Sequence, residues 1–281
     1  MIKPKKLKRG DTVAIVSLSS GTAGDKEFRH RYEQGKKRLE EVFGVKTVTM
    51  PNALKGSEYL SKHPEARAKD FMDALKDKNI KGIICNIGGA DTIRLLPYID
   101  FDVIKNNPKV FMGYSDTTVN HFMMYKAGVT SYYGPSVMCE FAENYKMHDY
   151  TKKYVDEVLF RNFENITITS SPKWTSEFLD WSNEAYDSQK RKMHYEKHGY
   201  EVLQGKGDFA GELLGGCIDV FPMFIGTKIW PSINDWENKI LFLETSEDEV
   251  PPDYIEYYLR NLIAQGIIDK INGIIIGKPQ N

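Results

Sequence analysis

Cysteine is scarce in this chain of 281 residues, and the net charge is close to zero. The three cysteines, Cys85, Cys139 and Cys217, are scattered through apolar sequence, which predicts reduced thiols in a core and disfavours a disulfide framework or a zinc site. No run approaches the roughly 18 apolar residues of a membrane span. The charged start, residues 1–6, lacks the apolar core of a signal peptide behind it. We therefore expect a cytoplasmic protein without membrane contact.

The balance of charges narrows the choice of partners. The 38 basic and 39 acidic residues leave a formal net charge of -1. Such a chain offers no general electrostatic attraction to nucleic acid or to an anionic membrane. We expect small neutral or zwitterionic substrates instead, and the length suggests one large or two ordinary domains.

The first part of the chain alternates between strand and helix patterns. Because parallel strands need crossover helices, this order predicts a parallel sheet covered by helices on both faces, within an N-terminal domain at residues 1–165. The expected strands are 12–17, 45–50, 82–87, 109–112 and 129–135, and the expected helices are 25–43, 64–78, 117–127 and 150–160.

The pattern breaks between about residues 165 and 205. This stretch is polar and aromatic and shows no sustained period, so it predicts a linker and a long loop of the kind that forms lids or binding sites. A smaller α/β domain follows, so that residues 166–281 form the loop and the C-terminal domain. Its expected elements are a helix at 213–225, a strand at 239–243, a helix at 252–265 and a strand at 273–276.

A serine lies at a predicted strand-turn-helix junction. The tetrapeptide Gly113-Tyr114-Ser115-Asp116 follows an apolar strand and precedes a helix. A hydroxyl placed there projects above the carboxyl edge of the sheet, where backbone N–H groups can stabilise negative charge. One interpretation is that Ser115 is a nucleophile. The other is that Ser115 only caps the helix.

The strand at 82–87 runs into a pair of glycines. Because consecutive parallel strands end at one edge, the amides of Gly88 and Gly89 can face Ser115. Glycine lets a substrate carbonyl approach closely. We therefore predict the N–H groups of Gly89 and Asp116 as oxyanion donors, while a plain turn at Gly88-Gly89 is the alternative.

Glu244 stands at the carboxyl end of a predicted buried strand. A carboxylate there can hold the tautomer of a histidine and stabilise its charged form. The alternative is an acidic turn that caps the helix at 252–265. A metal site is disfavoured because no histidine lies at ligand spacing from this acidic cluster.

Taken in order, these motifs resemble the LD-carboxypeptidase family over nearly the whole chain. The resemblance implies a cytoplasmic serine peptidase with a Ser-Glu-His triad, a flavodoxin-like N-terminal domain and a smaller C-terminal domain. It also implies Ser115 as nucleophile, Glu244 as triad acid, Gly89 and Asp116 as oxyanion hole, and no metal or organic cofactor. The matching segments are 11–17, 88–89 with 94–100, 113–116, 134–135, 211–216 and 243–244.

The subgroups of this family differ in substrate. Murein recycling enzymes release a terminal D-alanine from a tetrapeptide, whereas microcin C immunity peptidases cleave the amide between an aspartyl group and a modified adenylate. The aromatic stretch with Trp174, Phe178 and Trp181 resembles the loop of the second group. Aromatic faces of this kind can stack on a nucleobase. We expect Gly88, Phe178 and Trp181 to bind a small peptide or peptidyl-nucleotide, with ordinary packing as the alternative for the aromatic residues. A homodimer is left open.

The chain departs from the family pattern at two places. Cys217 follows Gly215-Gly216 where the family often has asparagine. The family histidine lies in a Gly-His motif beyond the last matched strand, and residues 1–281 end before it. His121 is six residues after Ser115 on one helix, or ~9 Å along the axis, which is too far for a hydrogen bond. The expectation is a truncated product or a non-catalytic ligand-binding relative with two triad members of three.

Overall fold

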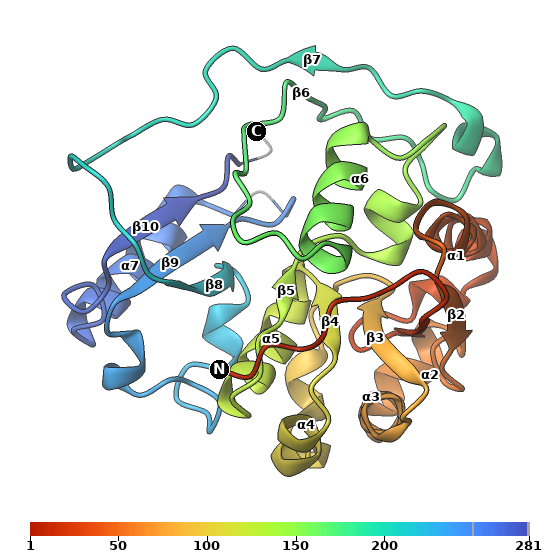
Figure 1. The fold of residues 1–281 in the computed structure, drawn as a ribbon, viewed down its shortest axis with the longest axis horizontal. Coiled ribbons are helices and arrows are strands. Elements are labelled where there is room, and N and C mark those ends of the chain that lie inside the picture. The colour runs from red at the N-terminus through yellow and green to blue at the C-terminus, as the bar shows by residue number, and fades with distance from the viewer. Residues whose placement is uncertain (249, 280–281) are drawn as a thin grey trace. The chain divides into compact units, whose positions relative to one another are not determined.

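A five-stranded parallel sheet forms the centre of the first part of the chain, in the order β2-β1-β3-β4-β5 (Figure 1). This is the flavodoxin-like order, so the expected fold class is confirmed. The computed structural model describes residues 1–248 and 250–279. The strands are β1 (Thr12–Val16), β2 (Lys46–Thr49), β3 (Ile80–Cys85), β4 (Val110–Gly113) and β5 (Tyr132–Tyr133).

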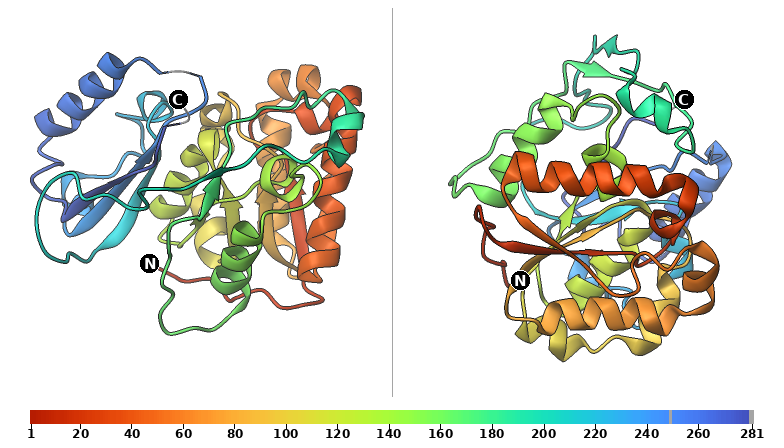
Figure 2. Two further views of the ribbon diagram at one scale, coloured as in Figure 1. Left: turned by 90° about the horizontal axis from the view of Figure 1, so that it is seen from above. Right: turned by 90° about the vertical axis from the view of Figure 1, so that its right-hand side faces the viewer.

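Helices cover both faces of this sheet, with α1 on one face and α3 and α4 on the other (Figure 2). Pro64 occupies the first turn of α3, where its missing N–H costs nothing. Gly44 ends α1 in the left-handed conformation at φ 67°. The helices are α1 (Arg29–Phe43), α2 (Ser57–Lys62), α3 (Pro64–Lys76), α4 (Phe101–Asn106), α5 (Thr118–Lys126) and α6 (Asp149–Val155).

The inner strands of the sheet carry the core. Strands with helices on both faces read as continuous apolar runs, and this sequence follows that rule. Strand β2, at the edge of the sheet, is more exposed. The buried residues of β1, β3 and β4 include Val13, Ala14, Ile15, Val16, Ile83, Ile84, Val110 and Phe111.

The chain after α6 is mostly irregular up to residue 200, as the sequence predicts. Two short strands, β6 (Lys173–Trp174) and β7 (His194–Tyr195), pair antiparallel. A 3₁₀ turn, Glu184–Ser188, lies between them. This stretch belongs to the first compact unit, Met1–Tyr200, and the second unit is Glu201–Asn281. A division of the fold at residues 165 and 166 stays a prediction.

The second unit contains a parallel sheet in the order β10-β9-β8. Its strands are β8 (Glu212–Cys217), β9 (Lys239–Glu244) and β10 (Gly273–Ile276), and its helix is α7 (Pro252–Ala264). The predicted helix at 213–225 was wrong, because this segment begins with β8 beside β9. A side chain at Gly215 would come within 1.8 Å of the Phe242 carbonyl oxygen, so the glycine permits this close strand pairing.

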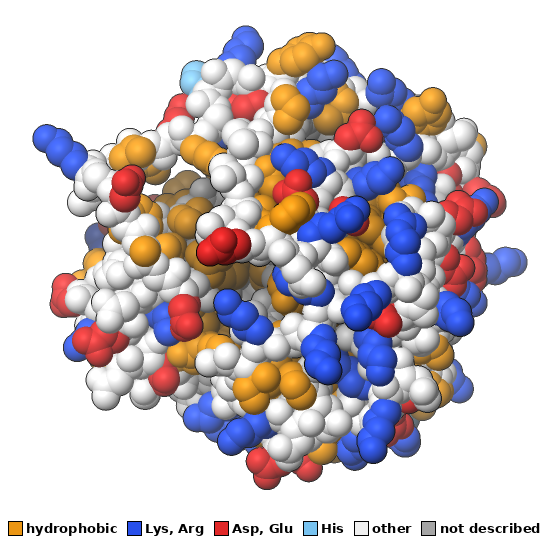
Figure 3. Space-filling model, in the orientation of Figure 1, with side chains coloured by type: hydrophobic (Ala, Val, Ile, Leu, Met, Phe, Trp, Pro, Cys, Tyr) orange, Lys and Arg blue, Asp and Glu red, His pale blue; other side chains and the backbone are white. Residues whose placement is uncertain are grey.

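Among the described residues, no helix is both long and apolar enough to cross a membrane. Lys and Arg side chains are the more frequent charges on the face drawn in Figure 3, with Asp and Glu among them. The near-zero net charge of the chain therefore does not make every part of its surface neutral.

Candidate active site

Ser115 lies at a sharp turn directly after β4. Its φ of 59° is in the left-handed region, which residues other than glycine rarely adopt. A 3₁₀ turn, Ser115–Thr117, leads from it into α5. The Ser115 N–H donates to the Tyr133 hydroxyl at 2.9 Å. A serine held in a strained strand-to-helix turn is the geometry of a nucleophile elbow.

The helix-capping alternative for Ser115 is not supported by this geometry. Neither the 3₁₀ turn nor α5 has a side-chain cap hydrogen bond. The Thr118 hydroxyl instead donates to the Ser115 carbonyl at 2.7 Å. Gly113 is required for packing, because a side chain there would come within 2.8 Å of Thr117 Cγ2 and 3.0 Å of Cys85 Cβ.

The glycine pair after β3 lies against the serine, as the sequence predicts. A Cβ atom at Gly88 would be 2.8 Å from Ser115 Cβ, 2.9 Å from Ser115 Oγ and 3.4 Å from the Asp116 amide nitrogen. Gly89 has a φ of 139°, and a Cβ atom there would be 2.5 Å from Ser19 Oγ. The lack of a side chain at Gly88 therefore lets this loop pack closely on Ser115, and the lack of one at Gly89 lets it pack on Ser19.

The side chain of Asp116 joins three loops at this edge of the sheet. It is fully buried, and one carboxylate oxygen accepts hydrogen bonds from the Ser19 hydroxyl, the Asp91 N–H at 2.9 Å and the Thr92 N–H at 2.8 Å. These donors come from the loops after β1 and β3, while Asp116 follows β4. The sequence predicts a role for the backbone amide of Asp116 only, and it carries no signal for this role of the carboxylate.

Arg67 of α3 bonds to the same loops, those after β1 and β3. Its side chain is fully buried and forms an ion pair with Asp91. It also donates to the carbonyl oxygens of Leu18 at 3.1 Å and Ser19 at 3.0 Å. Nothing in the local sequence marks Arg67 or Asp91, since their contact depends on how α3 packs on the sheet.

Half-buried side chains, those of Cys139 and Glu140, lie beside Tyr114, the residue that precedes Ser115. Burial, followed by the charges of Glu140 and Cys139, raises the pKa of Tyr114 well above its ordinary value. Burial also raises the pKa of Glu140, although the Ser136 N–H donates to its carboxylate at 3.1 Å. The segment 136–140 thus packs against the turn at Ser115, a contact for which the local sequence gives no signal.

The ring nitrogens of His121 are occupied away from the serine hydroxyl. One contacts the Gly113 carbonyl at 2.9 Å and the other the Ser131 hydroxyl at 2.8 Å. Burial lowers the pKa of His121 to about 4. His30, His63, His148 and His194 contact Asp187, Glu65, Glu143 and Trp174 respectively.

Glu244 is the last residue of β9 and pairs in register with Cys217. Burial, with the charges of Glu244 and Asp219, raises the pKa of the Cys217 thiol. Whether Glu244 serves as a triad acid or belongs to the acidic turn before α7 stays a prediction. Cys217 and Glu244, the two positions that the sequence marks in the second unit, are thus direct neighbours on adjacent strands.

The predicted aromatic residues of the loop have different surroundings. Trp181 packs against the core cluster of the first unit, and the Arg31 guanidinium lies 4.2 Å from its ring centroid. Phe178 is 71% exposed, with its ring 6.3 Å from that of Trp181. Trp174 stacks on His194 at 4.7 Å. Packing thus accounts for part of the Trp181 surface but not for Phe178.

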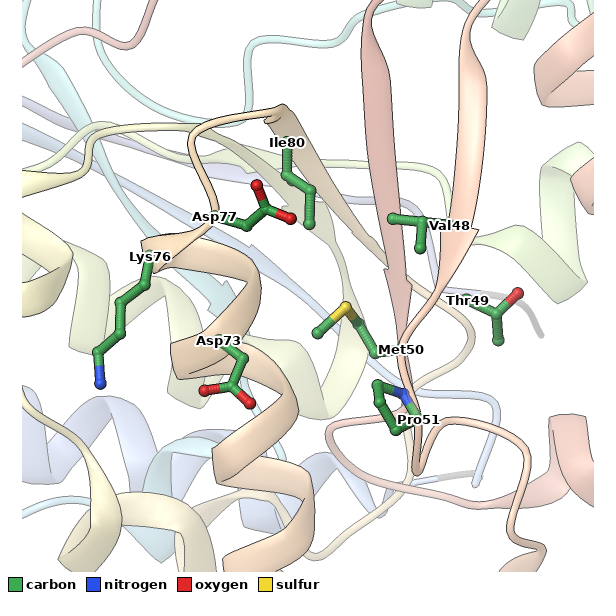
Figure 4. Close-up of a pocket in the computed structure, with 8 residues that line it drawn as sticks. All are labelled: Val48, Thr49, Met50, Pro51, Asp73, Lys76, Asp77 and Ile80. Carbon is green, nitrogen blue, oxygen red and sulfur yellow. The ribbon is translucent and has the colours of Figure 1, made fainter.

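A surface pocket of about 520 Å³ lies elsewhere, between β2, the end of α3 and the start of β3 (Figure 4). It shares no lining residue with the predicted site, so we do not assign it to the active site. Its lining residues are Val48, Thr49, Met50, Pro51, Asp73, Lys76, Asp77 and Ile80. Over the described ranges, no group of three or more His, Cys, Asp or Glu residues is placed to hold a metal ion.

A parallel α/β sheet with a serine in a strained turn beside a glycine loop is the arrangement of α/β serine hydrolases. Comparison with known proteins narrows this class. The LD-carboxypeptidase N-terminal domain matches residues 13–134, and the LD-carboxypeptidase C-terminal domain matches residues 210–281. The chain belongs to the LD-carboxypeptidase family, and this membership supports serine carboxypeptidase chemistry.

Relatives of two kinds are similar to the chain. The microcin C7 self-immunity protein MccF of Escherichia coli is 30% identical over 273 residues, 96% of this chain and 76% of the relative. A probable murein peptide carboxypeptidase of Bacillus subtilis is 28% identical over 276 residues, 98% of this chain and 74% of the relative.

Solved structures give the same result. An MccF-like protein from Streptococcus pneumoniae in complex with AMP has a TM-score of 0.87 and 37% identity, covering 96% of this chain and 82% of that chain. MccF in complex with aspartyl sulfamoyl adenosine has a TM-score of 0.81 and 27% identity, covering 100% of this chain and 81% of that chain.

Proposed function

We propose that this protein is a serine peptidase that hydrolyses an amide bond near the C-terminus of a small peptide or peptide conjugate. Ser115 is the nucleophile, Glu244 the acid of the triad, and the N–H groups of Gly89 and Asp116 the oxyanion donors. The observation that carries this proposal is the strained turn at Ser115 with Gly88 packed against its side chain.

The reaction follows from these roles. Ser115 Oγ attacks the scissile carbonyl carbon while its proton passes to a histidine base, and the amide C–N bond breaks as the amine leaves with that proton. Water then hydrolyses the resulting serine ester and restores the hydroxyl. Backbone N–H groups aimed at the oxyanion contribute about 3–4 kcal/mol each to lowering the barrier. The base is a histidine other than His121, whose two ring nitrogens are bonded elsewhere.

For the substrate, we favour an amide between an aspartyl group and an adenylate. The exposed ring of Phe178 and the ring of Trp181 offer aromatic surface for a nucleobase, and a stacked base contributes ~1–3 kcal/mol. Related structures hold AMP or aspartyl sulfamoyl adenosine. The alternative is release of D-alanine from a murein tetrapeptide, which the similarity to the murein peptide carboxypeptidase favours.

Two substrates and two tryptophan variants test this choice. Trp181→Ala should weaken cleavage of the aspartyl-adenylate amide by about 10-fold or more, because the stacking energy is lost, and should change tetrapeptide cleavage little. Trp174→Ala is the matched control from the same loop. Equal losses on both substrates would show a packing role for Trp181. Cleavage of the tetrapeptide alone by the wild type would establish the murein alternative, and binding without turnover of either substrate would identify a non-catalytic relative.

A further inference from the structure

The aromatic loop, the stretch that carries Trp174, Phe178 and Trp181, is held to the rest of the first unit by a partly buried ion pair. Glu143 is 5% exposed, and its two carboxylate oxygens accept from Nε of Arg191 at 2.8 Å and from its Nη2. The third nitrogen of this guanidinium, Nη1, donates to the carbonyl of Glu177 at 3.0 Å. The carboxylate of Glu177 in turn accepts from the N–H of Lys192. One arginine therefore fixes the residue directly before Phe178.

A second set of contacts holds the same loop at Trp181. The Arg31 guanidinium, which is 2% exposed, lies under the Trp181 ring. Its orientation is set by the Asn144 side-chain oxygen at 3.2 Å and by the Asp187 carboxylate at 3.9 Å. Asp187 also contacts His30 at 2.6 Å. A planar guanidinium held on several sides supports one face of an aromatic ring and leaves the position of the ring well defined.

These contacts connect the loop to the nucleophile edge of the sheet. Arg31 Nε donates to the Met138 carbonyl at 3.1 Å, and the Met138 N–H donates to the Asn86 carbonyl at 2.9 Å. Asn86 lies two residues before Gly88, which contacts Ser115. The chain of bonds thus runs from Trp181 through Arg31 to the loop that borders the serine.

We propose that Glu143 and Arg191 are positioning residues that hold Phe178, with Trp181 on its Arg31 support, as a preformed platform for the purine base of the substrate. This inference rests on the proposed nucleotide-bearing substrate. An ordered platform binds a base more tightly than a mobile loop does, because less conformational entropy is lost on binding. Neither residue touches the reacting atoms, so their effect is on affinity for the nucleotide part.

The polar contacts around Glu143 favour its charged form. Burial by itself raises the pKa of this carboxyl group, but the hydrogen bonds and charges of His148 and Arg191 outweigh burial and lower the pKa to about 2. Arg38 fixes the surrounding backbone by donating to the carbonyls of Phe141 at 3.2 Å and Tyr145 at 3.1 Å. Glu143 is therefore a charged anchor for the Arg191 guanidinium.

The test compares Arg191→Gln with the matched control Arg161→Gln, whose arginine pairs with Asp156 at the surface. Two quantities are measured on the full chain: the dissociation constant of AMP by calorimetry, and hydrogen exchange of the amides of residues 177–183. We expect Arg191→Gln to weaken AMP binding about 10-fold and to speed exchange of the loop, while Arg161→Gln changes neither. Thermal unfolding of each variant reports whether the fold is intact.

Glu143→Gln and the double variant Glu143→Gln/Arg191→Gln keep the inference testable if one variant is unstable. If the two side chains act as one unit, the loss of AMP affinity in the double variant will be much less than the sum of the single losses. The inference would be overturned if Arg191→Gln bound AMP as tightly as the wild type does. It would also be overturned if hydrogen exchange of the loop amides were the same in the two proteins. A wild type that does not bind AMP would instead overturn the proposed nucleotide-bearing substrate, and the platform with it.

Discussion

Gly88 packs on Ser115 so closely that even a methyl group at its Cα atom would lie 2.8 Å from Ser115 Cβ and 2.9 Å from its hydroxyl oxygen. We expect Gly88→Ala to lower kcat/KM by about 100-fold, because a shift of about 1 Å in a reacting group has an effect of that size. Steady-state kinetics measures the loss of kcat/KM. Thermal unfolding measures stability, and the unfolding temperature should change little.

Gly134→Ala is the control for this experiment. A Cβ atom at Gly134 would meet only Met112 Sδ at an ordinary 3.8 Å. Its activity should therefore stay near that of the wild type. If Gly88→Ala behaved like this control, the close contact between Gly88 and Ser115 would not matter for catalysis.

Single substitutions can separate the proposed catalytic roles of Ser115 and Glu244 from purely structural roles. Ser115→Ala should reduce turnover by several orders of magnitude without unfolding the protein, because only the nucleophilic oxygen is removed. Glu244→Gln should reduce turnover by roughly 10⁴-fold near neutral pH, the scale known for an amide in place of a triad acid. Glu247→Gln, an exposed neighbour, is the control. Retention of more than about a tenth of the activity in Ser115→Ala would exclude it as the nucleophile.

The carboxylate of Asp116 should matter for stability as well as for catalysis. Asp116→Ala leaves the buried Thr92 N–H without its acceptor and removes the shorter of the two hydrogen bonds of the Asp91 N–H, which should cost about 2–4 kcal/mol of unfolding free energy. Urea denaturation measures this loss. Asp102→Ala, at an exposed helix start, should cost less than about 1 kcal/mol. Equal stability of the two variants would contradict the role assigned to Asp116.

The Glu143 carboxylate predicts a specific dependence of stability on pH. Its pKa is about 2 in the folded protein, below the ordinary value of 4.5, so its charged form stabilises the fold above pH 4.5 and this contribution is lost as the pH falls toward 2. The stability difference between wild type and Glu143→Gln, from urea unfolding, should be constant near neutral pH and shrink below about pH 4.

Glu58→Gln serves as the reference in this pH series. Its partner Lys62 lies at the surface, where an ion pair adds little to stability. A difference for Glu143→Gln that stays constant down to about pH 3 would show that the carboxylate is not held by its partners in the folded state.

Local sequence patterns were sufficient for much of the first unit. Alternating apolar runs and helical periods predict β1, β3, β4, α1, α3 and α5, because these signals depend on neighbours a few residues apart. They also predict that Gly88 lies near Ser115, since consecutive parallel strands end at one edge. The same approach was wrong for β8, because periodicity alone does not assign a short apolar run such as the one that begins at Leu213 to a helix or to a buried strand. Only the pairing with β9 decides between the two.

What the sequence by itself determined is therefore the parallel α/β fold, the serine turn and the glycine loop beside it. Tertiary structure alone decided that the Asp116 carboxylate binds the loops after β1 and β3, and that Arg191 reaches Glu143, 48 residues earlier in the chain. Residues so far apart in the sequence belong to no common local pattern from which their contact could be predicted. Their meeting depends on how helices and loops pack over the sheet, and this packing sets both the burial of each charge and its partner.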